Sequence, residues 1–190
     1  MTYRSRAAET CAEHRLPRRI AVVGTTGSGK TTLASQLAET LAYPHVELDA
    51  LHWEADWTPA TIDVFRQRTV EALSRDAWVV DGNYSKVRDI VWTRAEMVVW
   101  LDYPLPTIMG RLILRTFRRI FIREELWSGN RERLWTQLFT RDSLFLWALR
   151  SYKRRRREYP ELLRRPEHAH ITAVHLPSPR AAREWLAGLT

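Results

Sequence analysis

Short runs of β-branched and aromatic residues alternate along the chain with longer stretches in which apolar residues recur at helical spacing. Each run ends in or beside glycine, aspartate or proline, which is typical of buried parallel strands that lead into loops. We predict five strands, at residues 20–23, 45–49, 78–82, 98–102 and 171–176. Because strands that alternate with helices form parallel sheets with right-handed crossovers, the pattern predicts an α/β fold.

The helical stretches carry their own start and stop signals. Leucines recur every four positions over residues 30–42, where we predict the first helix. A second predicted helix, over 59–75, has Thr58 as its cap and Pro59 as its first helical residue. A further helix is predicted to begin at Ser178, directly after the fifth strand.

The length of 190 residues suits one α/β domain. Residues 1–18 are polar and charged, and we expect a disordered lead there, with a single domain over 19–190. Residues 111–165 show no strand pattern and are rich in arginine, so we expect a helical lid inserted between the last two strands. No uncharged apolar run reaches the length that a membrane span requires, and we expect a soluble protein without a membrane partner.

Charge and cysteine content narrow the function. Lysine and arginine number 30 against 22 aspartates and glutamates, which gives a net charge of +8 and predicts an anionic partner. A single cysteine, Cys11, allows neither an internal disulfide nor a zinc-binding thiol cluster. We therefore expect a reducing compartment, the cytoplasm.

The most specific motif follows the first strand and opens the first helix, as the Gly-x-x-x-x-Gly-Lys-Ser/Thr phosphate-binding loop does. In this motif backbone amides surround a phosphate, Lys30 reaches the β- and γ-phosphates, and the Thr31 hydroxyl binds Mg²⁺. The motif predicts ATP and Mg²⁺ as cofactors. The expected nucleotide-binding residues are Gly24, Thr25, Thr26, Gly27, Ser28, Gly29, Lys30, Thr31 and Thr32.

Asp81 ends the third predicted strand, directly before Gly82. A carboxylate at this edge of a parallel sheet lies beside the P-loop and can orient the magnesium shell. The alternative is a turn or helix-cap aspartate with no metal nearby.

Several further motifs complete the pattern: Leu48 to Trp53, Val80 to Tyr84, Arg123 to Glu132, and Ser178 to Arg180. With them, the chain from about Arg18 resembles the small P-loop kinases of the nucleoside monophosphate and shikimate kinase type. More closely, it resembles bacterial proteins described as adenylate kinase-like or DNA topology modulation proteins. The resemblance implies a three-layer αβα P-loop NTPase fold with a five-stranded parallel sheet.

The resemblance also implies an acceptor site. In these kinases the carboxylate that ends the second strand faces the acceptor, which makes Asp49 a base or positioning group, with a loop cap as the alternative reading. The stretch from Asp81 lacks the proline and arginine that follow it in adenylate kinases, which argues against AMP as the acceptor. The other candidate acceptor-binding residues are His52, Trp53, Asn83, Tyr84 and Arg88.

The expected lid begins near Arg111 and Arg115, which lie one helical turn apart and share a face, and Arg115 is a further candidate for nucleotide binding. Arg123 and Arg131 are the candidates for closing over the transferring phosphate, where an arginine can raise the rate by about 10³ or more. Arg180, after the fifth strand, is a candidate for stacking on adenine. The run Arg154 to Arg157 covers all sides of a helix, so we assign most of it, including Arg155 and Arg156, to a solvated surface.

These residues predict an ATP-dependent phosphotransferase that moves the γ-phosphate to a small, nucleotide-like acceptor. One alternative is a nucleic-acid-associated ATPase or a kinase of polynucleotide ends. The basic composition supports this alternative. It is nevertheless not favoured, because no DNA-reading motif is present. Another alternative is a nucleotide-binding regulator without turnover.

Overall fold

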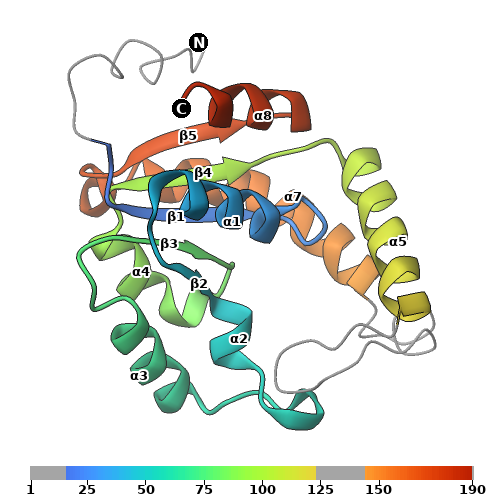
Figure 1. Cartoon of the computed structure of the whole chain (residues 1–190), viewed down its shortest axis with the longest axis horizontal. Coiled ribbons are helices and arrows are strands. Elements are labelled where there is room, and N and C mark those ends of the chain that lie inside the picture. The colour runs from blue at the N-terminus through green and yellow to red at the C-terminus, as the bar shows by residue number, and fades with distance from the viewer. Residues whose placement is uncertain (1–15, 123–143, 190) are drawn as a thin grey trace.

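A computed structural model describes residues 16–122 and 144–189 of the chain. Its centre is a parallel five-stranded sheet in the order β2-β3-β1-β4-β5 (Figure 1). The strands are β1 (Arg19–Gly24), β2 (His45–Glu47), β3 (Trp78–Asp81), β4 (Met97–Leu101) and β5 (Thr172–Leu176). All five predicted strands are therefore present.

The longer helices are α1 (Lys30–Leu41), α3 (Ile62–Ala72), α4 (Arg88–Arg94), α5 (Leu105–Ile122), α7 (Leu144–Leu163) and α8 (Pro179–Ala187). Short helical turns are α2 (Leu48–His52), η1 (Ala55–Trp57), η2 (Ser85–Val87) and η4 (Pro166–His168). Within these described segments, no helix combines the length and apolar character needed to cross a membrane.

Helices cover both faces of the sheet because alternate strand residues point to opposite sides (Figure 1). On one face, Ala21 and Val80 pack against Phe65 of α3, Trp92 of α4 and Tyr159 of α7. The opposite core joins β1, β3, β4 and β5 to α1 and α8, and takes in Ile108 of α5. The predicted three-layer αβα fold is confirmed.

The second predicted helix begins later than expected. Its cap is Thr61, whose side chain accepts a hydrogen bond from the Val64 amide at 3.4 Å. Pro59 instead forms an isolated antiparallel β-bridge with Trp53, and the Ala60 amide donates to the His52 carbonyl at 2.8 Å. These backbone contacts keep the residues before Thr61 extended, so the prediction of Thr58 as cap was wrong.

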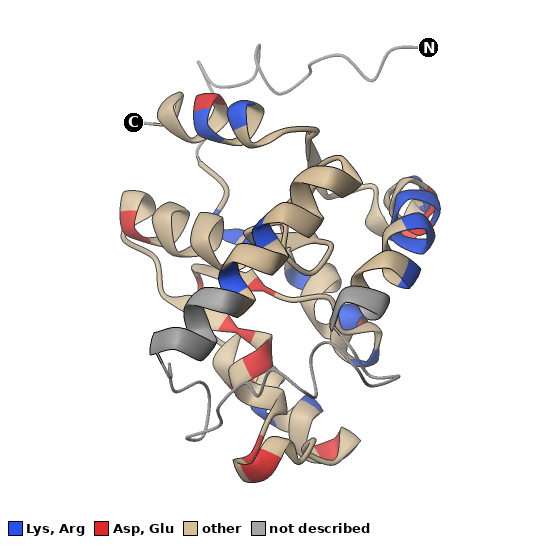
Figure 2. Cartoon of the chain, turned by 90° about the vertical axis from the view of Figure 1, so that its right-hand side faces the viewer, with Lys and Arg blue, Asp and Glu red and all other residues tan. Residues whose placement is uncertain are grey.

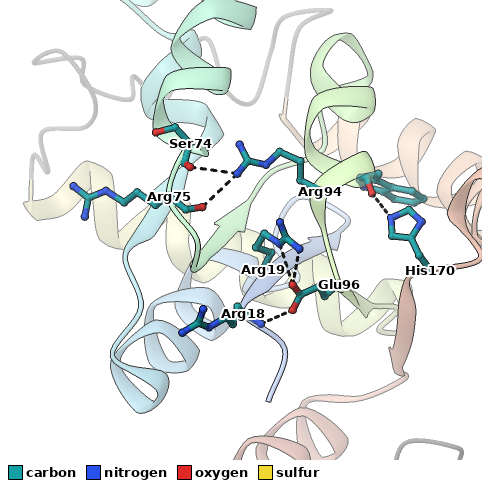
Figure 3. Close-up of polar contacts among 8 residues, drawn as sticks. Arg18, Arg19, Ser74, Arg75, Arg94, Glu96 and His170 are labelled. Carbon is teal, nitrogen blue, oxygen red and sulfur yellow. Dashed lines mark hydrogen bonds and ion pairs between the residues drawn. The ribbon is translucent and has the colours of Figure 1, made fainter. Parts of the chain in front are cut away.

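A polar network closes the sheet edge at which the strands begin (Figure 3). Glu96 accepts hydrogen bonds from the Arg19 guanidinium at 2.7 Å and from the Arg18 amide at 2.7 Å. Arg94 donates to the carbonyls of Ser74 and Arg75. The P-loop follows the other end of β1, so this network engages arginines far from the predicted nucleotide site.

The predicted domain limits stay predictions. The expected lead lies almost wholly outside the described residues, and β1 begins at Arg19. The expected lid, 111–165, takes in the second part of α5 and all of α7.

Candidate active site

The P-loop backbone adopts conformations that favour glycine. Gly27 and Gly29 have φ of 84° and 89°, in the left-handed region. A Cβ at Gly24 would lie 2.7 Å from the Leu101 carbonyl oxygen, and one at Gly27 would lie 2.9 Å from that of Ile108. Gly24 and Gly27 therefore leave room for backbone only, whereas at Gly29 it is the positive φ that favours glycine.

The start of α1 is suited to an anion. Gly29 is its N-cap and provides no side-chain hydrogen bond, so the first-turn amides remain for a ligand. The Ser28 hydroxyl is fully buried and has no hydrogen-bond partner in the structure. Thr31 and Thr32 expose their side chains on the same turn. The loop therefore fits the phosphates of ATP, and the Thr31 hydroxyl suits Mg²⁺.

Lys30 is the point at which charged groups from several elements meet. Burial lowers the pKa of Lys30 to about 8, and the nearby Arg155 and Arg115 act in the same direction. The carboxylates of Asp81 and Asp49 act in the opposite direction. The structure thus gathers groups from α1, α2, β3, α5 and α7 around one amine.

Asp81 ends β3 and is 1% exposed. Its Oδ2 lies 3.2 Å from Nε2 of His45, on the neighbouring strand β2. Burial alone would lower the pKa of His45, but the hydrogen bond and charge of Asp81 outweigh it and raise the pKa. His45 was not among the predicted site residues, because no local pattern indicates that it lies beside Asp81.

Asp49 does not end a strand, as predicted, but is the second residue of the short helix α2. Strand β2 stops at Glu47, and the chain turns at once into this helix. Even so, the Asp49 carboxylate lies near Lys30 and accepts a hydrogen bond from the Tyr84 hydroxyl. The prediction that Asp49 ends the second strand was therefore wrong, and its role toward the acceptor stays a prediction.

His52 lies in an aromatic cluster behind Asp49. Its ring centroid is 4.8 Å from those of Trp53 and Phe65 and 4.7 Å from that of Tyr84. The residue is 8% exposed, and its Nδ1 has no hydrogen-bond partner in the structure. Burial lowers the pKa of His52. A neutral ring packed in this way is part of an aromatic wall that includes Tyr84, the hydrogen-bond partner of Asp49.

Asn83 was predicted to bind the acceptor, but its amide holds the P-loop. Its Oδ1 accepts from the Gly24 amide at 3.1 Å, and its Nδ2 donates to the Gly24 carbonyl at 2.5 Å. The Tyr159 hydroxyl of α7 donates to the same Oδ1 at 2.8 Å. With its amide occupied in this way, Asn83 joins three segments at the start of the phosphate loop.

A cavity of about 20 Å³, room for about one water molecule, lies beside Asp81. Its wall includes Leu48, Tyr84, Arg88 and Trp92. Arg88 forms an ion pair with Glu158 at 2.8 Å and lies over the Trp92 ring. The candidate acceptor residues Tyr84 and Arg88 thus share one hollow with Asp81.

The assignment of Arg155 to a solvated surface was wrong. Arg155 is 6% exposed, and its guanidinium donates to the Gly24 carbonyl at 3.4 Å. Burial lowers the pKa of Arg155. Arg156 does lie at the surface, but it forms an ion pair at 3.0 Å with the buried Asp102. Figure 2 shows the basic residues gathered along α7 and spaced along α5.

The remaining predicted arginines differ in position. Arg111 donates to the Ser28 carbonyl at 3.0 Å, and Arg115 lies near Lys30, so this face of α5 borders the P-loop. Arg180 is 82% exposed and pairs with Glu184 at 2.6 Å. Arg123 and Arg131 lie outside the described residues.

Comparison with known proteins relates this site to small kinases. No family model matches the chain. The shikimate kinase of Synechococcus elongatus is 29% identical over 133 residues, which cover 59% of this chain and 70% of that enzyme. Shikimate kinase 2, chloroplastic, of Oryza sativa is 32% identical over 109 residues, or 49% of this chain and 35% of that protein.

Solved structures agree on the fold. Shikimate kinase from Acinetobacter baumannii in complex with shikimate superposes with a TM-score of 0.55 at 19% identity, covering 92% of this chain and 91% of that one. A gluconokinase from Sinorhizobium meliloti 1021 gives 0.52 at 24% identity, covering 93% of each chain.

These comparisons confirm the prediction of a small P-loop kinase with ATP and Mg²⁺ as cofactors. The relatives are shikimate kinases and a gluconokinase, so they do not support the narrower likeness to adenylate kinase-like or DNA topology modulation proteins. Their names give no support to a nucleic-acid partner. The cytoplasmic localisation of the protein stays a prediction.

Proposed function

We propose that this chain transfers the γ-phosphate of ATP to a hydroxyl group of a small acceptor bound beside Asp49. The observation that carries the proposal is the convergence of Asp49, Asp81 and Arg155 on Lys30, at the mouth of the P-loop. Phosphoryl transfer needs little covalent chemistry from the protein and depends on positioned charge of this kind.

The proposed roles follow from position. The P-loop amides and Lys30 bind the β- and γ-phosphates. The Thr31 hydroxyl and the Asp81 carboxylate would hold Mg²⁺, which would neutralise charge on the phosphates. Asp49 accepts the proton of the acceptor hydroxyl. At the same time the acceptor oxygen bonds to the γ-phosphorus, and the bond from phosphorus to ADP breaks.

Arg155 is placed to bind a phosphate or other anion near Gly24. Its guanidinium is buried, and its hydrogen bond in the structure goes to a carbonyl rather than to a carboxylate. A buried cation is costly unless it is paired with negative charge, and an incoming anion would supply such charge. We therefore propose Arg155 as a cation on the transferring group. The roles predicted for Arg123 and Arg131 stay predictions.

The acceptor is proposed only as a small hydroxylated molecule. The sequence predicts a nucleotide-like acceptor, whereas the similar proteins are named for shikimate and gluconate, which are hydroxy acids. Both classes offer a hydroxyl to Asp49 and an anionic group, a carboxylate or a phosphate, to Arg88. A substrate panel has to include both.

The test is an assay of ADP release across nucleosides, nucleotides, hydroxy acids and small polyols, with Lys30→Ala as the inactive control. An acceptor that raises ADP release at least about tenfold above the rate with water alone supports the proposal. ATP binding without any acceptor-dependent ADP release would contradict it. ATP that remains intact for hours would favour the alternative of a nucleotide-binding regulator.

A further inference from the structure

The Asp49 carboxylate is held from one side by the phenol of Tyr84. The Tyr84 hydroxyl donates its hydrogen bond to Oδ1 of Asp49. Tyr84 belongs to the loop between β3 and η2, whereas Asp49 belongs to α2, so the contact joins two segments 35 residues apart. One oxygen of the carboxylate is thereby engaged by the protein, and among the described residues no side chain hydrogen-bonds to Oδ2.

Tyr84 is itself fixed by its surroundings. Its ring lies 4.7 Å from the ring of His52 and packs edge-on against Phe65 at 5.0 Å. Phe65 is completely buried, so the surface against which Tyr84 packs is part of the core. The indole N–H of Trp53 lies within hydrogen-bonding reach of the Tyr84 oxygen. These contacts restrict the ring, whose hydroxyl donates to Asp49.

The direction of donation is set by chemistry. An indole N–H can only donate, so toward Trp53 the Tyr84 oxygen can only be an acceptor, and it must use its own proton elsewhere. Burial and the charge of Asp49 raise the pKa of Tyr84, so the phenol keeps its proton at neutral pH. Tyr84 is therefore a permanent donor and not an acid or base.

We propose that Tyr84 is a positioning residue, which holds Asp49 so that its second oxygen faces the acceptor hydroxyl. From the sequence, Tyr84 and Trp53 were instead expected to bind the acceptor directly. The inference rests on the proposed function. In the step, the acceptor O–H proton passes to Oδ2 of Asp49, the acceptor oxygen bonds to the γ-phosphorus, and the bond from phosphorus to ADP breaks.

Tyr84→Phe tests the proposal, because it removes the hydroxyl and keeps the ring that packs on His52 and Phe65. We expect kcat to fall by about tenfold to a hundredfold through misplacement of Asp49, with KM for ATP unchanged. Tyr43→Phe is the matched control, since Tyr43 is a partly buried tyrosine that packs in the opposite core. It should leave both constants unchanged.

A double-mutant cycle with Asp49→Asn separates positioning from a structural role. If Tyr84 acts through Asp49, then Tyr84→Phe should change kcat by less than about twofold in the Asp49→Asn background. Equal losses in both backgrounds, or a normal kcat in Tyr84→Phe, would overturn the positioning role while wild-type turnover still stands. An absence of wild-type turnover with every acceptor would instead refute the proposed function. Thermal melting of each variant identifies any loss that comes from unfolding.

Discussion

Replacing Arg155 is the sharpest test of the site, because the sequence and the structure give opposite expectations. As one of four consecutive arginines it was assigned to solvent, but the structure buries it against Gly24. Arg155→Met removes the charge and keeps much of the packing volume. If the guanidinium binds the transferring phosphate, kcat should fall by about 10²–10³, or about 3–4 kcal/mol of transition-state stabilisation.

The same substitution should affect stability in a different way. In the absence of ligand, Arg155 is a desolvated cation, so its replacement by an apolar side chain should leave the free energy of unfolding unchanged or raised by about 1 kcal/mol. The stabilisation of the protein by ATP, however, should shrink, because the bound phosphates lose a partner. Thermal melting with and without ATP and Mg²⁺ measures both effects.

Arg157→Ala is the matched control, since Arg157 lies on the same helix and is exposed. It should change neither kcat nor the ATP-dependent shift in melting temperature. If Arg155→Met behaves like Arg157→Ala in both assays, the reasoning from burial is refuted. The nucleic-acid alternative predicts instead that both variants weaken a salt-sensitive affinity for DNA or RNA to a similar extent.

Three further predictions concern the P-loop and the metal. Lys30→Ala should lower turnover by at least about a hundredfold while the fold remains, and near-normal turnover would contradict the P-loop assignment. Because the pKa of Lys30 is lowered to about 8, its amine loses the proton as the pH rises through 8, and ATP affinity measured calorimetrically should fall from pH 7 to 9. That pH dependence should be absent in Lys30→Ala. Asp81→Asn should raise the Mg²⁺ concentration needed for half-maximal rate, and an unchanged magnesium curve would return Asp81 to a turn role.

The sequence alone determined the features that depend on local pattern. Short β-branched runs between helical stretches specified five parallel strands, because alternation of this kind admits few other arrangements. The P-loop was equally clear, since the glycine spacing, Lys30 and Thr31 all lie within one turn between a strand and a helix. Asp81 could be placed at the P-loop because the carboxyl ends of parallel strands share one edge of the sheet.

Only the tertiary structure decided which side chains meet across the sheet. Four consecutive arginines point in all directions around α7, so local pattern could not show that packing turns Arg155 inward, 131 residues away from its partner Gly24. The contacts of His45 with Asp81, Asn83 with Gly24 and Tyr84 with Asp49 likewise join segments separated by dozens of residues. Such contacts follow from the order of the strands and the packing of α7. For that reason the chain by itself identified the nucleotide loop, whereas the arrangement of charge and hydrogen bonds around it emerged only from the fold.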